Sequence, residues 1–276
     1  TEFLWQEGHT AHTTEQEAEE EARKMLSVYQ DFVEKYLAIS VIPGQKTESE
    51  KFPGALRTYS IEALMQDGKA LQAGTSHNLG QNFARAFNVA FTNAKGAREY
   101  AWQTSWGVST RLIGGLIMSH SDDKGLVLPP LIAPIKIVII PIWKTEEERT
   151  LVFEEARVLK NSFAEIDSEC VIDERDYCSP GFKFNEWEKK GVPIRVELGP
   201  KDIATKSAVV VRRDTGDKKI VLLNELSAHI GGELNKMQSD MLANSKKFQQ
   251  ENSHSVDDYV EFKKLFSGAP GFVYSH

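Results

Sequence analysis

An arginine at the predicted start of an apolar helix is the first candidate for chemistry. Residues 102–107 have the aromatic and β-branched character of a strand, and Ser109 can cap the helix that follows. Arg111 then lies in the first helical turn, where the helix dipole favours anions over cations. An anion such as a phosphate bound nearby would explain an arginine at this point. The alternative is a surface arginine paired with Asp122 or Asp123, and spacing alone favours that alternative.

The beginning of the chain carries a second group of chemically capable side chains. Because successive side chains of a strand point to opposite faces, Phe3, Trp5, Glu7 and His9 would share one face. Such a face offers aromatic rings for stacking, a carboxylate and an imidazole. The alternative is an edge strand of mixed polarity, and the pattern alone favours neither.

The third candidate is the segment 72–83, which reads Q-A-G-T-S-H-N-L-G-Q-N-F. The pattern predicts a strand that ends near Thr75 and a helix directly after it. Gln72, Thr75 and His77 would then lie at a strand–helix junction, where side chains can point into a cleft. An isolated histidine at a helix start is more often a cap or a packing residue, so the junction by itself assigns no role to His77.

These segments resemble motifs of the class II aminoacyl-tRNA synthetases, and their sequences are most similar to those of the prolyl-tRNA synthetase family. G-V-S-T-R-L-I-G with G-L-V-L-P-P resembles motif 3, residues 1–12 resemble the second strand of motif 2, and residues 72–83 match a further segment. The resemblance implies that Phe3 and Arg111 hold the adenine of ATP between them and that Arg111 is the catalytic residue holding phosphate. The other ATP contacts that we expect are Gln72, Thr75 and Ser109, with Gln72 also contacting Mg²⁺.

The same resemblance implies a pocket for L-proline. Lys51-Phe52-Pro53 resembles a family segment that places its phenylalanine over the proline ring, and a loop phenylalanine that merely packs is the alternative. In such a site the ionised carboxylate of proline attacks ATP, so positioning and electrostatic stabilisation matter more than a general base. The proline contacts implied are Trp5, Glu7, His9, Phe52 and His77.

The second half of the chain has a different pattern, because strands and helices alternate after Pro134, as in a three-layer α/β module. Residues 179–202 resemble the anticodon-binding domain of the prolyl, threonyl, histidyl and glycyl enzymes. The resemblance implies that Glu188, Arg195 and Lys201 contact anticodon bases, which suits their hydrogen-bonding groups. An ordinary surface network of the three charges is the alternative.

The fold class expected is therefore α/β (α+β), with three parts. Residues 1–130 would be the C-terminal half of a class II antiparallel-sheet catalytic domain, residues 131–225 the anticodon-binding domain, and residues 226–276 the start of a C-terminal helical or α+β domain. Within the last part we expect a helix from 223 to about 250, interrupted at Gly231-Gly232.

Composition limits the class of protein but not its activity. The 276 residues are 41% hydrophobic and 26% charged, without a run apolar enough for a membrane helix, so we expect no membrane partner. A net charge of −7 argues weakly against a nucleic-acid partner. Residues 179–220, however, contain ten Lys and Arg and only six Asp and Glu, so a local basic surface is available there. The two cysteines fit neither a metal site nor a disulfide framework, so a reducing cytoplasm is expected.

The resemblance also has gaps. Motif 1 and the first strand of motif 2, with its phosphate-binding arginine, are not found, so we expect the C-terminal part of a longer, homodimeric enzyme of the archaeal and eukaryotic type. Such a part would be inactive alone. The function expected is ATP-dependent formation of prolyl-adenylate and transfer of proline to tRNA(Pro). The alternatives are a non-catalytic tRNA-binding or regulatory module, and a related threonyl, glycyl or histidyl synthetase.

Overall fold

The computed structural model describes residues 2–164, 169–268 and 271–275, and the chain forms two compact units. Unit 1 comprises Thr1–Ser119 and Asn244–His276, and unit 2 comprises His120–Ala243. These units are divided at other points than the three predicted domains, whose boundaries at residues 130 and 225 stay a prediction.

Unit 1 is built on an antiparallel sheet in the strand order β1-β7-β4-β3-β2. β1 and β2 are thus the edge strands. The strands are β1 (Trp5–His12), β2 (Val41–Gln45), β3 (Arg57–Leu64), β4 (Ala70–Gly80) and β7 (Trp102–Ser109). Because neighbouring strands are in register, side chains paired across them share one face of the sheet.

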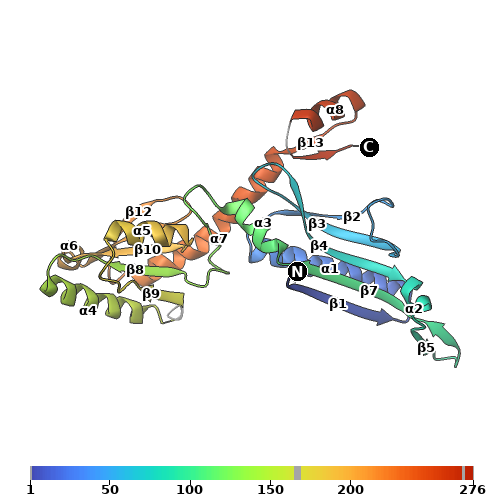
Figure 1. Ribbon diagram of the computed structural model, residues 1–276, viewed down its shortest axis with the longest axis horizontal. Helices are drawn as coiled ribbons and strands as arrows, with labels where there is room; N and C mark the ends of the chain where they lie inside the picture. The colour runs from blue at the N-terminus through green and yellow to red at the C-terminus, as the bar shows by residue number, and fades with distance from the viewer. Residues whose placement is uncertain (1, 165–168, 269–270, 276) are drawn as a thin grey trace. The chain divides into compact units, whose positions relative to one another are not determined.

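A long helix, α1 (Glu15–Lys35), packs on one face of this sheet (Figure 1). It begins with a capping box, in which Thr14 and Glu17 satisfy each other's backbone N–H groups. The sheet meets α1 through polar contacts, since the Ser76 hydroxyl donates to the Ala22 carbonyl over 2.7 Å. The buried apolar face of the helix consists of Ala18, Ala22, Leu26, Tyr29 and Val33. With α1 on this side, the opposite face of the sheet is the one that remains for a site.

The predicted helix directly after Thr75 is wrong, because β4 continues to Gly80. Residues 75–78 pair with both β3 and β7, and Asn78 accepts the Gly80 N–H at a bulge in the pairing with β7. Only a short helix, α2 (Asn82–Ala86), follows. His77 therefore lies inside a central strand and its side chain is fixed by the sheet register.

The remaining elements of unit 1 are short. A hairpin of β5 (Ala90–Thr92) and β6 (Arg98–Tyr100) precedes β7, and α3 (Arg111–His120) follows it. Near the C-terminus, β13 (Ser253–Ser255) pairs in parallel with β14 (Phe272–Tyr274), and α8 (Tyr259–Gly268) lies between them in sequence.

Unit 2 contains a mixed sheet in the order β12-β11-β10-β8-β9. β9, β8 and β10 are parallel, whereas β11 and β12 are antiparallel to their neighbours. The strands are β8 (Ile137–Pro141), β9 (Cys170–Ile172), β10 (Ile194–Leu198), β11 (Ser207–Arg212) and β12 (Lys218–Leu222), and the helices are α4 (Glu146–Ser162), α5 (Pro180–Lys189), α6 (Pro200–Ala204) and α7 (Leu226–Glu251), of which residues 226–243 belong to this unit.

Helices cover both faces of this sheet, which gives the predicted three layers. Ile137 and Ile139 of β8 are buried against α4 and α7, whereas the intervening Val138 and Ile140 pack with Phe184 of α5. This alternation is the period-2 pattern of a strand that is buried on both faces. The three-layer α/β prediction is confirmed.

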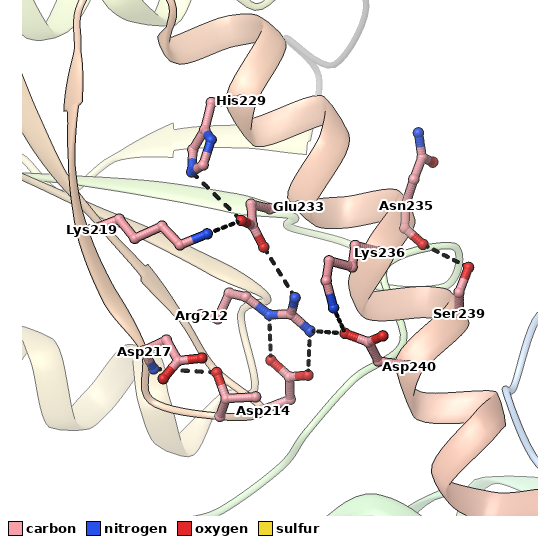
Figure 2. Close-up of polar contacts among 11 residues, drawn as sticks. Arg212, Asp214, Asp217, Lys219, His229, Glu233, Asn235, Lys236, Ser239 and Asp240 are labelled. Carbon is pink, nitrogen blue, oxygen red and sulfur yellow. Dashed lines mark hydrogen bonds and ion pairs between the residues drawn. The ribbon is translucent and has the colours of Figure 1, made fainter.

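The predicted break in the helix at Gly231-Gly232 is wrong, since α7 is continuous (Figure 1). Buried Ile230 and Leu234 carry its apolar face through the glycine pair, and a charged network anchors the same turn (Figure 2). Arg212, at the end of β11, donates to Asp214, Glu233 and Asp240 over 2.7 to 3.0 Å. Tertiary packing thus overrides the low helix propensity of glycine.

No helix in the described part of the chain combines the length and apolar character that crossing a membrane requires.

Candidate functional site

One cavity in unit 1 collects all five predicted ATP contacts. Its volume is about 170 Å³, and it lies where β1, β4 and β7 meet the start of α3. The lining residues are Phe3, Trp5, Gln72, Ala73, Gly74, Thr75, Gly107, Val108, Ser109 and Arg111. Residues from three separate segments of the sequence are thus brought together around one space.

The pairing of β1 with β7 brings the two ends of this group together. Trp5 is the register partner of Ser109, and the Thr110 N–H donates to the Leu4 carbonyl over 3.1 Å. Phe3 therefore lies near the first turn of α3, with its ring 6.2 Å from that of Trp5. Phe3 and Trp5 remain 66% and 55% exposed, so their rings are available for stacking on a ligand.

Arg111 lies at the start of α3 as predicted, and it has no carboxylate partner in the part of the chain that the structure describes. Its backbone N–H donates to the Ser109 hydroxyl over 3.3 Å, and its Nη1 donates to the Gln72 carbonyl over 3.3 Å. Asp122, one of the alternative partners, binds Arg213 instead. The guanidinium is therefore positioned by a neutral carbonyl and keeps its charge uncompensated beside the cavity.

Three of the five predicted proline contacts, Glu7, His9 and His77, lie on two adjacent rows across the same sheet, whereas Trp5 pairs with Ser109 and Phe52 lies in the segment between β2 and β3. One row runs His9, Ser105, His77, Thr58, and the next runs Glu7, Gly107, Thr75, Ser60. Since paired residues share a face, both rows lie on the side that α1 leaves open. Gly107 in the second row has no side chain, and the Trp5 ring lies over it, 3.6 Å from where a Cβ atom would be.

Specific contacts hold the titratable groups of these rows. His9 Nε2 lies 3.1 Å from Glu7 Oε1, and His77 Nδ1 lies 3.0 Å from the Thr58 hydroxyl. Burial lowers the pKa of His77 below its ordinary value, so this imidazole is neutral at pH 7. The Phe52 ring lies 5.1 Å from the His77 ring and is 46% exposed, so an accessible aromatic ring adjoins His77.

A polar stripe on β3 was not predicted from the sequence. Thr58 and Ser60 are buried on the open face, and Glu62 accepts hydrogen bonds from Ser60 and Lys46. The signal was available, because the alternation of R-T-Y-S-I-E places Thr58, Ser60 and Glu62 on one side of a strand.

A second cavity, in unit 2, contains two of the three predicted anticodon contacts. It has a volume of about 240 Å³ and is lined by more cations than carboxylates. Lys201, which lies on α6, does not line it. The lining residues are Lys124, Val138, Trp187, Glu188, Val192, Arg195, Val211, Arg212, Arg213, Gly216 and Lys218.

Each predicted base contact in this cavity already has a partner. Glu188 is paired with Lys124 over 3.2 Å. Arg195 is paired with Glu197 over 3.0 Å, and its guanidinium lies 4.5 Å from the centre of the Phe184 ring. Nε and Nη2 of Arg195 both donate to Glu197 Oε1, so the outer Nη1–Nη2 edge of the guanidinium is the one left for a base or a phosphate.

No cluster of three or more His, Cys, Asp or Glu suited to a metal ion occurs among the described residues. Cys170 is buried, and Cys178 is partly buried. A Mg²⁺ ion that enters with a nucleotide needs few protein ligands, because phosphate and water oxygens supply most of its coordination. Gln72, which lines the cavity in unit 1, is the residue expected to supply one such oxygen.

Comparison with known families agrees with this arrangement. Residues 1–120 match the class II tRNA synthetase core domain (G, H, P, S and T), and residues 136–232 match the anticodon binding domain. The chain is 52% identical over 275 residues to the proline–tRNA ligase of Flavobacterium psychrophilum, and 55% identical over 267 residues to that of Chloroflexus aurantiacus. The chain belongs to the prolyl-tRNA synthetase family.

The match to members of this family covers 100% and 95% of the chain, respectively, but only 56% and 55% of the two relatives. A third relative, the proline–tRNA ligase of Prosthecochloris aestuarii, is 51% identical, and the match covers 57% of its length. The chain therefore spans somewhat more than half the length of these relatives. Their names do not distinguish the archaeal and eukaryotic type from other members, so that assignment stays a prediction.

Proposed function

We propose that the chain carries the nucleotide-binding, proline-binding and anticodon-binding surfaces of a proline–tRNA ligase. The observation that supports this most is the nucleotide cavity, which Phe3, Gln72, Thr75, Ser109 and Arg111 line together. ATP and L-proline are the small substrates, Mg²⁺ enters with ATP, and tRNA(Pro) is the macromolecular substrate. The cytoplasm and a homodimeric state are further expectations of the same proposal.

In the first reaction an oxygen of the proline carboxylate attacks the α-phosphorus of ATP. A new bond forms between these two atoms, the bond from the α-phosphorus to the bridging oxygen breaks, and pyrophosphate leaves with the electron pair. Arg111 stabilises negative charge on the phosphates because its guanidinium lies beside the cavity without a carboxylate partner. Phe3 supplies the ring on which the adenine stacks.

The proline pocket adjoins this cavity on the same face of the sheet. Glu7 supplies a carboxylate for the positively charged imino group of proline, and Phe52 and Trp5 supply apolar rings. In the second reaction a ribose hydroxyl of the tRNA attacks the carbonyl carbon of the adenylate and AMP leaves. Position and charge dominate both steps, and neither requires a histidine as general base.

Recognition of tRNA(Pro) rests on the cavity in unit 2. Arg195 offers the paired N–H donors that suit guanine, and Glu188 accepts hydrogen bonds from exocyclic amines. The surrounding Lys124 and Lys218 attract the phosphate backbone. Lys201 lies outside this cavity, and we propose that it contacts RNA beyond the bases bound there.

The experiment is proline-dependent exchange of labelled pyrophosphate into ATP, with the natural full-length protein. We expect exchange with proline and none above background with threonine or glycine. Binding of tRNA(Pro) without any exchange would support the non-catalytic module instead, and exchange with threonine or glycine alone would contradict the assignment of proline.

A further inference from the structure

Thr58 lies at the centre of a short chain of hydrogen bonds on the open face of the unit 1 sheet. Its hydroxyl oxygen accepts the Phe52 N–H over 2.9 Å and lies 3.0 Å from His77 Nδ1. Thr58 is only 3% exposed, so water does not compete for this hydroxyl. One side chain thus connects the loop that carries Phe52 to the strand that carries His77.

The direction of the second hydrogen bond follows from the groups available. A hydroxyl has one proton to donate, and a buried donor without an acceptor is costly. Among the described residues, His77 Nδ1 is the one acceptor within hydrogen-bond distance of Thr58 Oγ1. The hydroxyl proton must therefore point to Nδ1, which in turn must be unprotonated.

The tautomer of His77 is then fixed. A neutral imidazole carries one proton, so the proton lies on Nε2 when Nδ1 accepts a hydrogen bond. The lowered pKa of His77, which results from burial, agrees with a neutral ring. In the described part of the chain Nε2 has no hydrogen-bond partner, and it is not one of the buried unsatisfied atoms, so it remains accessible as a donor.

We propose that Thr58 is a positioning residue that holds His77 in its Nε2–H tautomer, so that His77 donates a hydrogen bond to a carboxylate oxygen of bound proline. This rests on the proposed function for the identity of the ligand, but the tautomer itself does not. The same hydroxyl holds the backbone of Phe52, so the donor and the aromatic side of the pocket are set by one group. Loss of the hydroxyl would disturb both.

The tautomer is measured by nitrogen–proton correlation NMR of the chain labelled with ¹⁵N-histidine, at about pH 7.5, where the ring is neutral. The His77 signals are assigned by their loss in the variant His77→Asn. We expect an unprotonated Nδ1 and a protonated Nε2. A proton on Nδ1 would overturn the proposal, whatever the protein's activity. Because this measurement uses the unaltered chain, it does not depend on a variant that folds poorly.

Two variants then test the role of the hydroxyl. Thr58→Val keeps the shape and removes the donor, and we expect His77 to become a mixture of tautomers and KM for proline to rise about tenfold in the full-length protein. Thr58→Ser restores the hydroxyl and should restore both readouts, and KM for ATP should not change in either variant. An unchanged tautomer in Thr58→Val would refute the positioning role. A further outcome is that the unaltered protein shows the expected tautomer but no proline-dependent pyrophosphate exchange. That result would refute proline as the ligand, and with it the proposed function, while the hydrogen bond from Thr58 to His77 would stand.

Discussion

Phe3 and Arg111 line the same cavity, although one precedes the first strand of the sheet and the other begins the helix after the last. The antiparallel pairing of β1 with β7 makes this possible, since it ends with Trp5 opposite Ser109. An aromatic ring and a guanidinium on one cavity suit a ligand that has both a flat ring and negative charge. A nucleotide has both features.

Glu19 should make the stability of unit 1 depend on acid pH. Burial alone would raise its pKa, but hydrogen bonds from Tyr59, Asn78 and Arg23 and the charge of Arg57 lower the pKa from 4.5 to about 2. Because the folded-state value is the lower one, the stabilisation is present above about pH 4.5 and is lost as the pH falls toward 2. The shift corresponds to about 3 kcal/mol at neutral pH.

The variant Glu19→Gln tests this, measured by urea unfolding between pH 7 and pH 2.5. We expect the difference in unfolding free energy between the unaltered chain and the variant to shrink as the pH falls below 4.5. Glu20→Gln, at an exposed position of the same helix, is the matched control and should change stability by less than about 0.5 kcal/mol. A difference for Glu19→Gln that stays constant with pH would show that its charge is not what stabilises the fold.

Gly8 should not tolerate a side chain. A Cβ atom at this position would overlap the indole ring of Trp106, its partner on β7. We expect Gly8→Ala to destabilise unit 1 by about 1–3 kcal/mol, because overpacking forces the ring or the strand to move. Gly44→Ala is the control, since no atom lies within 4 Å of a Cβ there. Thermal unfolding followed by tryptophan fluorescence compares the two, and equal melting temperatures would refute the close approach of Gly8 to Trp106.

Removal of the Arg212 guanidinium should strongly destabilise unit 2. The group is 7% exposed and neutralises Asp214 and Glu233, which are 11% and 9% exposed (Figure 2). In Arg212→Met these carboxylates lose their buried partner, and we expect a loss of about 3–5 kcal/mol in the free energy of unfolding. Lys236→Met removes an exposed partner of Asp240 and should cost less than about 1 kcal/mol. Similar losses for both variants would mean that burial of the network contributes little.

Binding of tRNA(Pro) should depend on the geometry of Arg195 as well as on its charge. In Arg195→Lys the charge remains but the paired donors are lost, and we expect about tenfold weaker binding in fluorescence anisotropy at fixed salt. Glu188→Gln should also weaken tRNA binding. Lys201→Ala should weaken tRNA binding less, because Lys201 lies outside the cavity. Arg157→Ala, on the exposed side of α4, is the control for a general loss of charge. Equal effects at Arg157 and Arg195 would indicate non-specific attraction alone.

Local patterns in the sequence predicted the elements well where propensity and packing agree. The start of α3 at Arg111 is found as predicted, and the local T-x-x-E pattern at Thr14 forms a capping box. The prediction was wrong where tertiary contacts decide. His77 is in a strand because residues 75–78 are paired on both sides, and Gly231-Gly232 is helical because α7 is packed there and held by ion pairs.

The candidate site was only partly predictable for the same reason. Resemblance identified which residues to consider, but the rows across the sheet depend on strand register, which no single segment specifies. Thr58 was missed because its importance comes from its partner, and His77 is nineteen positions further along the chain. The grouping of Glu188 with Arg195, and not with Lys201, likewise depends on where α6 begins.

The most direct test of the nucleotide cavity is equilibrium binding of ATP by the natural full-length protein, compared among three variants. We expect Phe3→Ala and Arg111→Ala each to raise the dissociation constant by about tenfold or more, since each loses an interaction worth about 1–3 kcal/mol. Leu4→Ala, which removes an exposed side chain next to Phe3 that does not line the cavity, should bind ATP like the unaltered protein. ATP binding that is unchanged in both Phe3→Ala and Arg111→Ala would contradict the account.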